Sequence, residues 1–469
     1  MKKLLLIVVL LSLIVGALAV AAQAAFAAPV AKTHDDCNFI VAGKDATADG
    51  SVLMGYNNDW DVTNDTYLHV IPSPGSGLYQ YVQVLTQGDW PEGGINEKQL
   101  SVCYGVATDI ASKVEKADPY PDDGWDYEMW DNILQQCATA DQAIDLVQHM
   151  AATRGFGPDA AGSYAIADPD TAWVVEVYSG HHWAAERVPD NAVWEQPNML
   201  RIRQIDLSKP SKLRGSPDLV QFATSLGRYK PSDGPFDCAW AFGNRTDLQD
   251  PYNTYRLWGA LHKVAPSQRY DPSMPYSSRP VFVVPDHPLT RQDFAGVLRY
   301  HYEGTALDLT QNYVLGSPHL TDQRTICYAT TDYSAVWQLR DWLPNAVGGV
   351  MWLALCRPCS SVYVPVYDSV TSVPAAWTDT TAYDDFRTVA DSLDASGTVH
   401  GQNRYHYYIP LVHTFYGGFE AAEAAAQPSV ESIASCLPAS RRAAYLTAYS
   451  GQLATQARGL AQTLIGQMP

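Results

Sequence analysis

Cys37 and Asp59 are the first residues in the sequence whose types and spacing could do chemistry together. Apolar segments with strand character at 38–42 and 51–56 flank a turn-rich stretch at 46–50. A hairpin made from them would carry Asp59 back towards Cys37, at the start of the first strand. A thiol and a carboxylate would then share one end of a sheet, which suits a nucleophile and the group that orients it.

Two other interpretations of Cys37 have to be weighed. Lipidation requires small and aliphatic residues just before the cysteine, whereas Asp35 and Asp36 stand there. A disulfide is plausible, because the chain has eight cysteines, an even number, and exported proteins oxidise their thiols. The residues that follow Cys37 favour the nucleophile over the disulfide.

Ordered blocks of residues follow Cys37 along the chain. They are Gly43-Lys44, Asp49-Gly50-Ser51, Asn57-Asn58-Asp59, Gly94-Ile95-Asn96-Glu97, Ala167-Asp168 with Trp173 to Glu176, Pro197-Asn198, Tyr252-Asn253 with Arg256 and Trp258, His301 to Thr305, Arg324-Thr325, and Gln338 with Arg340, Leu343-Pro344, Gly348-Gly349 and Trp352. The series resembles the bacterial dipeptidases and secernins, cysteine hydrolases of the N-terminal-nucleophile superfamily that are related to bile-salt and penicillin-V acylases. The resemblance covers Cys37 to about Tyr367.

The resemblance implies an α+β fold, a four-layer αββα sandwich of two antiparallel sheets between helical layers, with a C-terminal helical extension. It also implies that Cys37 becomes the first residue of the mature chain. Its α-amino group, with an ordinary pKa of about 7.7 to 8.0, would then accept the proton of its own thiol, so neither a histidine nor a cofactor is needed. While Asp36 is attached, the nitrogen of Cys37 is an amide and cannot act as a base.

The family pattern gives catalytic roles to three further residues. Asp59 would orient the thiol and amine of Cys37; a turn-forming aspartate at a strand end is the alternative. Asn198 would donate a hydrogen bond to the oxyanion formed when the thiol attacks an amide carbonyl, although an asparagine after Pro197 also suits a plain turn. Arg256 would favour the thiolate over the thiol, or else pair with a surface carboxylate.

Two residues are expected to bind substrate. Asn96 precedes a strand-like segment at 101–106, which places it in a turn lining the pocket, where N–H groups could supply a second oxyanion donor. Tyr56 stands three residues before Asp59, where many bacterial dipeptidases have arginine and secernins lysine. The missing cation weakens the case for dipeptides as substrates, and a phenol would suit a larger or less charged acyl group.

Several elements that would position these residues show in the periodicity of the chain. Helical patterns occur at 126–138, 141–154 and 290–302, and Thr290 with Asp293 resembles a capping box. Past 418 the chain is alanine-rich and predicts one amphipathic helix, with Ser440 as its cap, that packs on the catalytic body or on a second copy of the chain. Its apolar positions are Leu446, Tyr449, Leu453, Ala457, Leu460 and Leu464.

The N-terminus has the pattern of a secretory signal peptide. Lys2 and Lys3 precede an apolar run at 4–22, and small residues then offer cleavage sites after Ala24 or Ala27. We expect export to the cell envelope or the medium, although an uncleaved segment could anchor the chain in the bilayer.

These patterns divide the chain into four parts. We predict a signal peptide at 1–27, a propeptide at 28–36, a hydrolase domain at 37–418 and a helical segment at 419–469. No later segment resembles a membrane span, so no stable membrane association is expected after processing.

Composition excludes some partners. The chain has 469 residues, 46% of them hydrophobic, enough for a large core. Its formal net charge of −19 argues against binding to nucleic acid, which needs a basic surface.

The other cysteines give no clear motif. Cys356 and Cys359 have C-x-x-C spacing, typical of a redox pair or half a zinc site, but no second such motif completes a metal site. Seven cysteines besides Cys37 allow at most three disulfides, and a buried reduced state is as plausible. The sequence therefore predicts neither a metal nor another cofactor.

Together these features predict an exported cysteine dipeptidase that hydrolyses small peptides through Cys37 after propeptide removal. An acylase acting on bile-salt, penicillin-like or N-acyl amides is one alternative. A catalytically silent, secernin-like binding protein is the other.

Overall fold

Antiparallel strands rich in valine, isoleucine, leucine and aromatic residues make up the centre of the fold, because these types pack well on a pleated surface. The computed structural model describes residues 37–60, 65–86, 88–106, 108–126, 128–395 and 404–468. Within these residues the strands form two sheets, one of six strands and one of eight.

The six-stranded sheet carries Cys37 at one end of its second strand. In spatial order its strands are β10 (Val193–Gln196), β1 (Asn38–Ala42), β2 (Val52–Asp59), β12 (Thr331–Leu339), β13 (Val350–Leu355) and β14 (Val364–Tyr367). The predicted hairpin is confirmed as β1 and β2, with Asn38 opposite Asn57. Every residue of β1, β2, β12 and β13 is buried, so both faces of these strands are covered.

The eight-stranded sheet faces the first one. In spatial order its strands are β11 (Leu213–Gly215), β9 (Trp183–Arg187), β8 (Ala172–Val177), β7 (Gly162–Ala167), β6 (Ser101–Val106), β5 (Trp90–Asn96), β4 (Tyr81–Thr86) and β3 (Tyr67–Ile71). Contacts of β1 with β6, β2 with β7 and β13 with β5 join the two sheets. The main hydrophobic core therefore lies between them.

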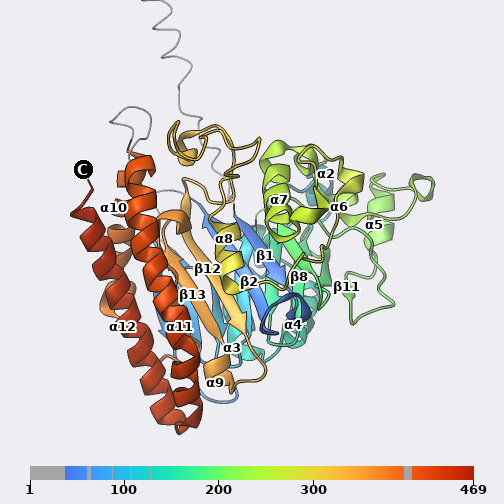
Figure 1. The fold of residues 1–469 in the computed structure, drawn as a ribbon. Coiled ribbons are helices and arrows are strands. Elements are labelled where there is room, and N and C mark those ends of the chain that lie inside the picture. The colour runs from blue at the N-terminus through green and yellow to red at the C-terminus, as the bar shows by residue number, and fades with distance from the viewer. Residues whose placement is uncertain are drawn as a thin grey trace, which may run out of the picture. The chain divides into compact units, whose positions relative to one another are not determined.

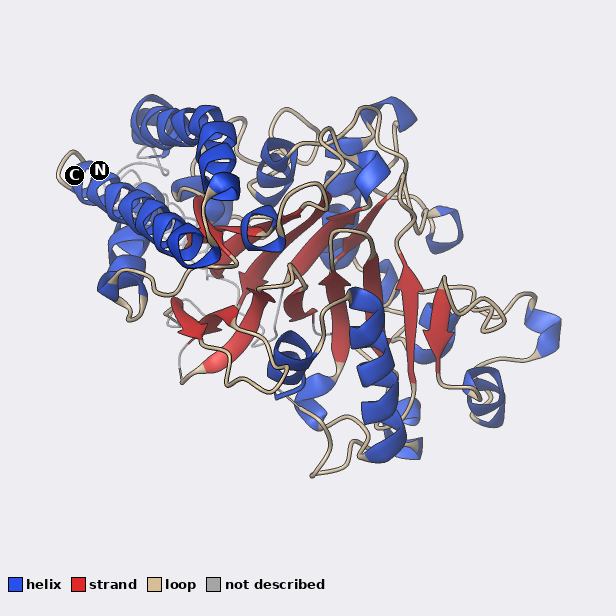
Figure 2. Cartoon of the chain, turned by 90° about the horizontal axis from the view of Figure 1, so that it is seen from below, coloured by secondary structure: helices blue, strands red, loops and turns tan. Residues whose placement is uncertain are grey.

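Helices cover the outer side of each sheet, as Figures 1 and 2 show. The helices α8 (Arg291–Leu298), α10 (Thr381–Asp394) and α12 (Ala439–Ile465) contact the six-stranded sheet, and α7 (Pro251–Val264) contacts β10. The helices α3 (Glu128–Gln136) and α4 (Ala140–Thr153) contact the eight-stranded sheet. This confirms the predicted αββα sandwich. The remaining α-helices are α2 (Ser112–Ala117), α5 (Leu219–Ser225), α6 (Cys238–Phe242), α9 (Asn345–Gly348) and α11 (Thr414–Cys436).

Local sequence accounts for the helix behind Cys37. The α8 helix begins with the predicted capping box, in which the Thr290 hydroxyl accepts from the Asp293 N–H and the Asp293 carboxylate accepts from the Thr290 N–H. Gly55 in β2 lets this helix pack close, because a Cβ there would lie 3.0 Å from Phe294. The α3 and α4 helices likewise match the two other helical patterns.

The C-terminal region differs from its prediction in two ways. It holds two long helices, α11 and α12, preceded by the π-helix η11 (Arg404–His413), where one helix was expected. Pro438 stands at the N-cap of α12, and Ser440 lies inside the helix instead of capping it, since a proline suits the start of a helix. The predicted domain boundary at 418/419 falls within α11.

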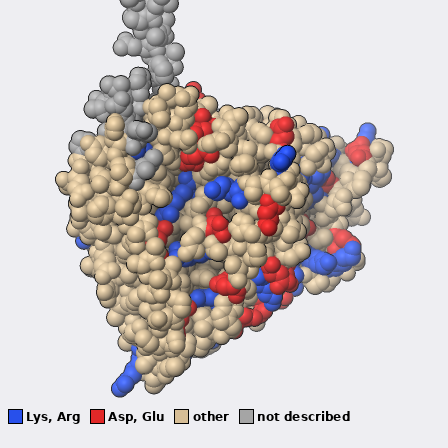
Figure 3. All heavy atoms as spheres, in the orientation of Figure 1, with Lys and Arg blue, Asp and Glu red and all other residues tan. Residues whose placement is uncertain are grey.

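The surface over α11 and α12 carries few charged side chains, whereas both signs of charge mix on the rest of the face shown in Figure 3. Within the described residues, no helix is both long enough and apolar enough to cross a bilayer. The predicted signal peptide and propeptide lie outside the described residues.

Candidate active site

Cys37 lies directly before β1, with 1% of its surface exposed. Since Asn38 pairs with Asn57, Cys37 lies beside the last residues of β2. The backbone N–H of Asp59 donates to Cys37 Sγ over 3.4 Å. The predicted juxtaposition of the thiol with Asp59 is therefore present, and it comes from the register of one hairpin.

The carboxylate of Asp59 points to a different set of partners. It forms an ion pair with Arg324 Nη2 and accepts a hydrogen bond from the Thr331 hydroxyl, and the Arg324 Nε donates to the Tyr252 hydroxyl over 3.3 Å. Burial raises the pKa of Asp59, and the charge of Arg324 opposes that rise. Asp59 thus offers its N–H to the thiol while an arginine holds its side chain.

Arg256 holds the backbone of Cys37. It lies in α7, whose first turn is capped by the Asp250 carboxylate accepting from the Tyr252 N–H. Its Nη1 donates to the Cys37 carbonyl oxygen over 3.0 Å and its Nη2 to Asn253 Oδ1 over 2.8 Å. The side chain is fully buried, so the structure places a cation at the backbone of Cys37.

Between the two sheets, the Cys37 side chain meets a polar network that begins at Tyr56. Burial raises the pKa of the Tyr56 phenol well above its ordinary value, and the charge of Cys37 adds to the effect, with a hydrogen bond between the two side chains. Asn58 Nδ2 donates to the Tyr56 oxygen over 3.2 Å and to Glu92 Oε2 over 2.8 Å. The Thr86 hydroxyl donates to Glu92 Oε1 over 2.8 Å.

Asn198 follows β10, the strand that pairs with β1 on the side away from β2. Phe39 pairs with Gln196, the last residue of β10, so Asn198 lies two residues beyond that pairing, on the edge of β1 near Cys37. Asn198 is half-buried, in a turn where the Met199 N–H donates to the Pro197 carbonyl oxygen. Its location suits the predicted oxyanion donor, and that role stays a prediction.

Asn96 lies where β5 ends and the turn to β6 begins. Its Nδ2 donates to the carbonyl oxygens of Leu134 and Cys137 at 2.7 and 2.8 Å, and its Oδ1 accepts from the N–H groups of Lys98 and Leu100. These bonds use its polar atoms to tie the β5–β6 turn to α3. Asn96 is also four residues along β5 from Glu92, about 13 Å at a strand's ordinary rise. The prediction that it lines the pocket finds no support in these contacts.

Three residues near Cys37 were not given a role from the sequence: Arg324, Thr331 and Glu92. Arg324 belongs to one of the ordered blocks, but nothing in its local pattern connects it with Asp59, which lies 265 residues away. Thr331 and Glu92 also reach the site only through strand pairing and sheet packing.

Side chains that could hold a metal ion lie elsewhere. His301, His319, Cys327 and Cys359 form a buried group whose ligand atoms lie within 4.8 Å of one another. No sequence motif indicated this site, because its members are far apart along the chain and only Cys359 belongs to the C-x-x-C motif. No disulfide joins any of the eight cysteines, all of which are among the described residues.

Comparison with known proteins identifies the family. The model of Peptidase family C69 matches residues 76–407, more than two thirds of the chain. The chain belongs to peptidase family C69. The matched region begins after Cys37 and Asp59 and includes Arg256 and Arg324.

Individual relatives agree with this membership. The chain is 28% identical over 392 residues to a dipeptidase of Bifidobacterium longum, covering 74% of this chain and 73% of that protein. It is 26% identical over 362 residues to a probable dipeptidase of Salmonella dublin, covering 71% and 81%. The resemblance to bacterial dipeptidases is thus confirmed. A penicillin V acylase from Agrobacterium tumefaciens matches in structure with a TM-score of 0.30 at 13% identity, covering 70% of this chain and 86% of that one.

Proposed function

We propose that this member of family C69 is an exported dipeptidase in which Cys37 becomes the N-terminal nucleophile once the residues up to Asp36 are removed. The observation that carries the proposal is the placement of Cys37 at the head of β1, where the Asp59 N–H meets its sulfur and Arg256 meets its carbonyl oxygen. The names of the relatives, dipeptidase and probable dipeptidase, support the choice of reaction.

The reaction follows from these groups. The freed α-amine of Cys37 takes the thiol proton, and the thiolate attacks the peptide carbonyl carbon. The carbonyl oxygen becomes an oxyanion, for which Asn198 is the proposed donor, while the N–H of Asp59 donates to the sulfur and favours the thiolate. The amine product leaves with a proton from the Cys37 ammonium, and water then hydrolyses the thioester. Arg256 keeps the backbone of Cys37 fixed throughout.

Glu92 gives a reason to prefer dipeptides over N-acyl amides. Its carboxylate lies on the thiol side of β2, linked through Asn58 to the Tyr56 phenol that contacts Cys37. A negative charge there attracts the free ammonium group of a dipeptide and offers nothing to an N-acylated one. Glu92 does not replace the cation that is missing at Tyr56; it would select the amino end of the substrate, where that cation would select a carboxyl end.

A substrate panel tests this function. Purified mature protein is assayed with dipeptides, their N-acetylated forms, a penicillin and a conjugated bile salt. We expect free dipeptides to have a kcat/KM at least about 10²-fold above the acylated compounds, the range that one well-placed polar contact provides. Equal or better turnover of the acylated compounds would favour the acylase alternative. A mature protein that begins with Cys37 and hydrolyses none of them would favour the silent binding protein.

Glu92→Gln supplies the matched control, because it keeps the side chain's shape and hydrogen-bonding oxygen while removing the charge. It should raise KM for free dipeptides and leave KM for N-acetylated ones unchanged. Equal effects on both substrates would show that Glu92 has only a structural role.

A further inference from the structure

Two histidines and two cysteines from separate parts of the chain converge in the interior, away from Cys37. His301 follows α8, His319 lies in a short 3₁₀ turn (Pro318–Leu320), Cys327 precedes β12, and Cys359 lies in the turn after β13. All four are buried. We refer to these four residues as the cysteine–histidine cluster.

The spacing of the ligand atoms fits a single tetrahedral ion. His301 Nε2 and His319 Nε2 are 3.1 Å apart, and His319 Nε2 lies 3.6 Å from Cys327 Sγ and 3.8 Å from Cys359 Sγ. With zinc bonds of about 2.05 Å to nitrogen and 2.3 Å to sulfur, a tetrahedron requires about 3.3 Å between nitrogens and about 3.6 Å between nitrogen and sulfur. The three separations given above are within a few tenths of an ångström of these values, and all four ligand atoms lie within 4.8 Å of one another.

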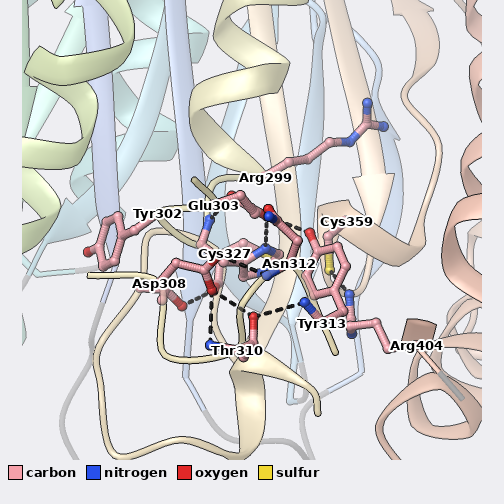
Figure 4. Close-up of polar contacts among 12 residues, drawn as sticks. Arg299, Tyr302, Glu303, Asp308, Thr310, Asn312, Tyr313, Cys327, Cys359 and Arg404 are labelled. Atoms are coloured by element: carbon pink, nitrogen blue, oxygen red, sulfur yellow. Dashed lines mark hydrogen bonds and ion pairs between the residues drawn. The ribbon is translucent and has the colours of Figure 1, made fainter. Parts of the chain in front are cut away.

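The groups behind the ligands also match a metal site. Each imidazole presents Nε2 to the centre and bonds a carboxylate through Nδ1, His301 to Glu303 at 2.8 Å and His319 to Asp394 at 2.7 Å. Such carboxylates fix the ring orientation and the tautomer of metal-binding histidines. Arg404 is fully buried, and its Nη1 donates to Cys359 Sγ over 3.3 Å, so a cation supports one sulfur as an anion. Figure 4 shows Cys327, Cys359, Glu303 and Arg404 gathered around this centre.

A bound ion would stabilise the chain segment that carries three of the four ligands. Of residues 299–330, all of which are described, only Pro318–Leu320 forms a helical turn, and none belongs to a strand of either sheet. A segment of this length without regular structure is uncommon within a compact domain and needs other means of fixation. The cluster would tie three points of this segment to the turn after β13.

An ion could also reach the cluster. Cys359 and Glu303 line a cavity of about 390 Å³ between α8 and α11, which also includes Arg299 and Glu420. Four protein ligands leave no open coordination position, and this is the arrangement of structural zinc sites, not of catalytic ones.

We propose that the cysteine–histidine cluster binds one zinc ion, held by His301 Nε2, His319 Nε2, Cys327 Sγ and Cys359 Sγ, and that this ion fixes the segment 299–330 to the six-stranded sheet. Binding releases the two thiol protons, so two thiolates and two neutral imidazoles give a neutral centre with Zn²⁺. Mixed sulfur and nitrogen ligands in a tetrahedron favour zinc over magnesium, calcium or manganese, which prefer oxygen. The site is independent of the proposed function of Cys37.

Metal analysis of the full-length protein, prepared without a histidine tag, tests the site. We expect about one zinc per chain, falling at least tenfold in Cys359→Ser and in His319→Gln. Cys356→Ser is the matched control, since Cys356 is a buried cysteine of the same C-x-x-C motif outside the cluster, and it should keep its zinc. Loss of zinc in the control to the same extent, or no zinc in the wild type, would overturn the proposal.

Cobalt replacement keeps the proposal testable if the variants fail to fold. The wild-type protein loaded with Co²⁺ should show thiolate-to-cobalt charge-transfer bands and the intense d–d bands of a tetrahedral site. Removing zinc with a chelator should lower Tm by roughly 5 to 10 °C, and added zinc should restore it. A Cys327–Cys359 disulfide found by non-reducing peptide mapping of the freshly purified protein would contradict zinc binding, because it consumes both thiolates.

Discussion

The molecule buries sulfur in two contrasting settings. At Cys37 the neighbours are a backbone N–H, a phenol and an arginine on the carbonyl oxygen, and the sulfur lies at the end of a strand beside a turn. At Cys327 and Cys359 the neighbours include two imidazoles that are hydrogen-bonded to carboxylates, and Arg404 donates to the Cys359 sulfur. In the first setting hydrogen-bond donors meet a single sulfur, whereas in the second two sulfurs and two imidazole nitrogens lie within 4.8 Å of one another. Burial alone therefore does not indicate the chemical role of a cysteine; the groups around its sulfur do.

Replacing Cys37 should give the largest effect, because it should abolish activity without changing the zinc content. Cys37→Ser should lower kcat by at least about 10³-fold, because a serine hydroxyl is a far weaker nucleophile with an amine as its base. The same variant should keep the zinc content and Tm of the wild type. Cys103→Ser, at a buried cysteine of β6 outside both sites, is the control and should retain its activity. A Cys37→Ser protein with wild-type turnover would refute the catalytic assignment.

Breaking the ion pair behind Cys37 should affect both activity and stability. Asp59→Asn leaves the buried Arg324 without its anionic partner, which destabilises a protein by about 3–5 kcal/mol. If the carboxylate also orients the amine of Cys37, kcat should fall by about 10²-fold at temperatures where the variant is folded. Denaturant unfolding and steady-state kinetics measure the two effects separately. A loss of stability with unchanged kcat would leave Asp59 as a structural residue only.

Replacing Asn198 should lower activity, whereas replacing Asn96 should lower stability. Asn198→Ala should lower kcat by about 10² to 10³-fold, about 3 kcal/mol of transition-state stabilisation, with little change in KM. Asn96→Ala should leave kcat unchanged and lower stability by about 1–3 kcal/mol, because buried carbonyl and N–H groups lose their partner. Equal kcat losses in both variants would restore the sequence-based expectation for Asn96.

Much of the Cys37 setting could be predicted from sequence because its geometry is local. Strand patterns and a turn within 23 residues determine that Asp59 returns to Cys37, and the capping box of α8 is equally local. Arg324 and Thr331 reach Asp59 from more than 260 residues further along the chain, and Glu92 reaches Asn58 from the opposite sheet, so no local period records any of the three. The cysteine–histidine cluster was missed for the same reason, since its ligands span residues 301 to 359 without a recognisable spacing.

The predicted C-terminal helical extension is present, but the boundary predicted at 418/419 falls inside α11. Gly417 and Gly418 stay helical because contacts with α12 and η11 outweigh the low helix propensity of glycine. Helix propensity therefore predicts helix boundaries poorly where tertiary packing stabilises the helix.

A pH dependence of stability is expected near Cys37. Glu195 in β10 lies opposite Ile40 of β1, and burial raises its pKa to about 8, with Arg201 and Arg256 opposing the rise. The folded state therefore holds a proton that the unfolded chain releases near its ordinary pKa, so this group's contribution to stability falls as pH rises from about 4.5 to about 8.

Glu195→Gln should remove the loss of stability at high pH, because an amide does not ionise. Its Tm should equal the wild-type value near pH 5 and exceed it at about pH 9. Differential scanning calorimetry across this range measures the difference. A difference independent of pH would show that Glu195 is already charged in the folded state.

The N-terminal residue of the mature protein tests the central claim most directly. Mass spectrometry and N-terminal sequencing of active protein should find a chain that begins at Cys37 with a free α-amine. Active protein that retains Asp36, or that begins at any residue other than Cys37, would contradict the amine-activated thiol.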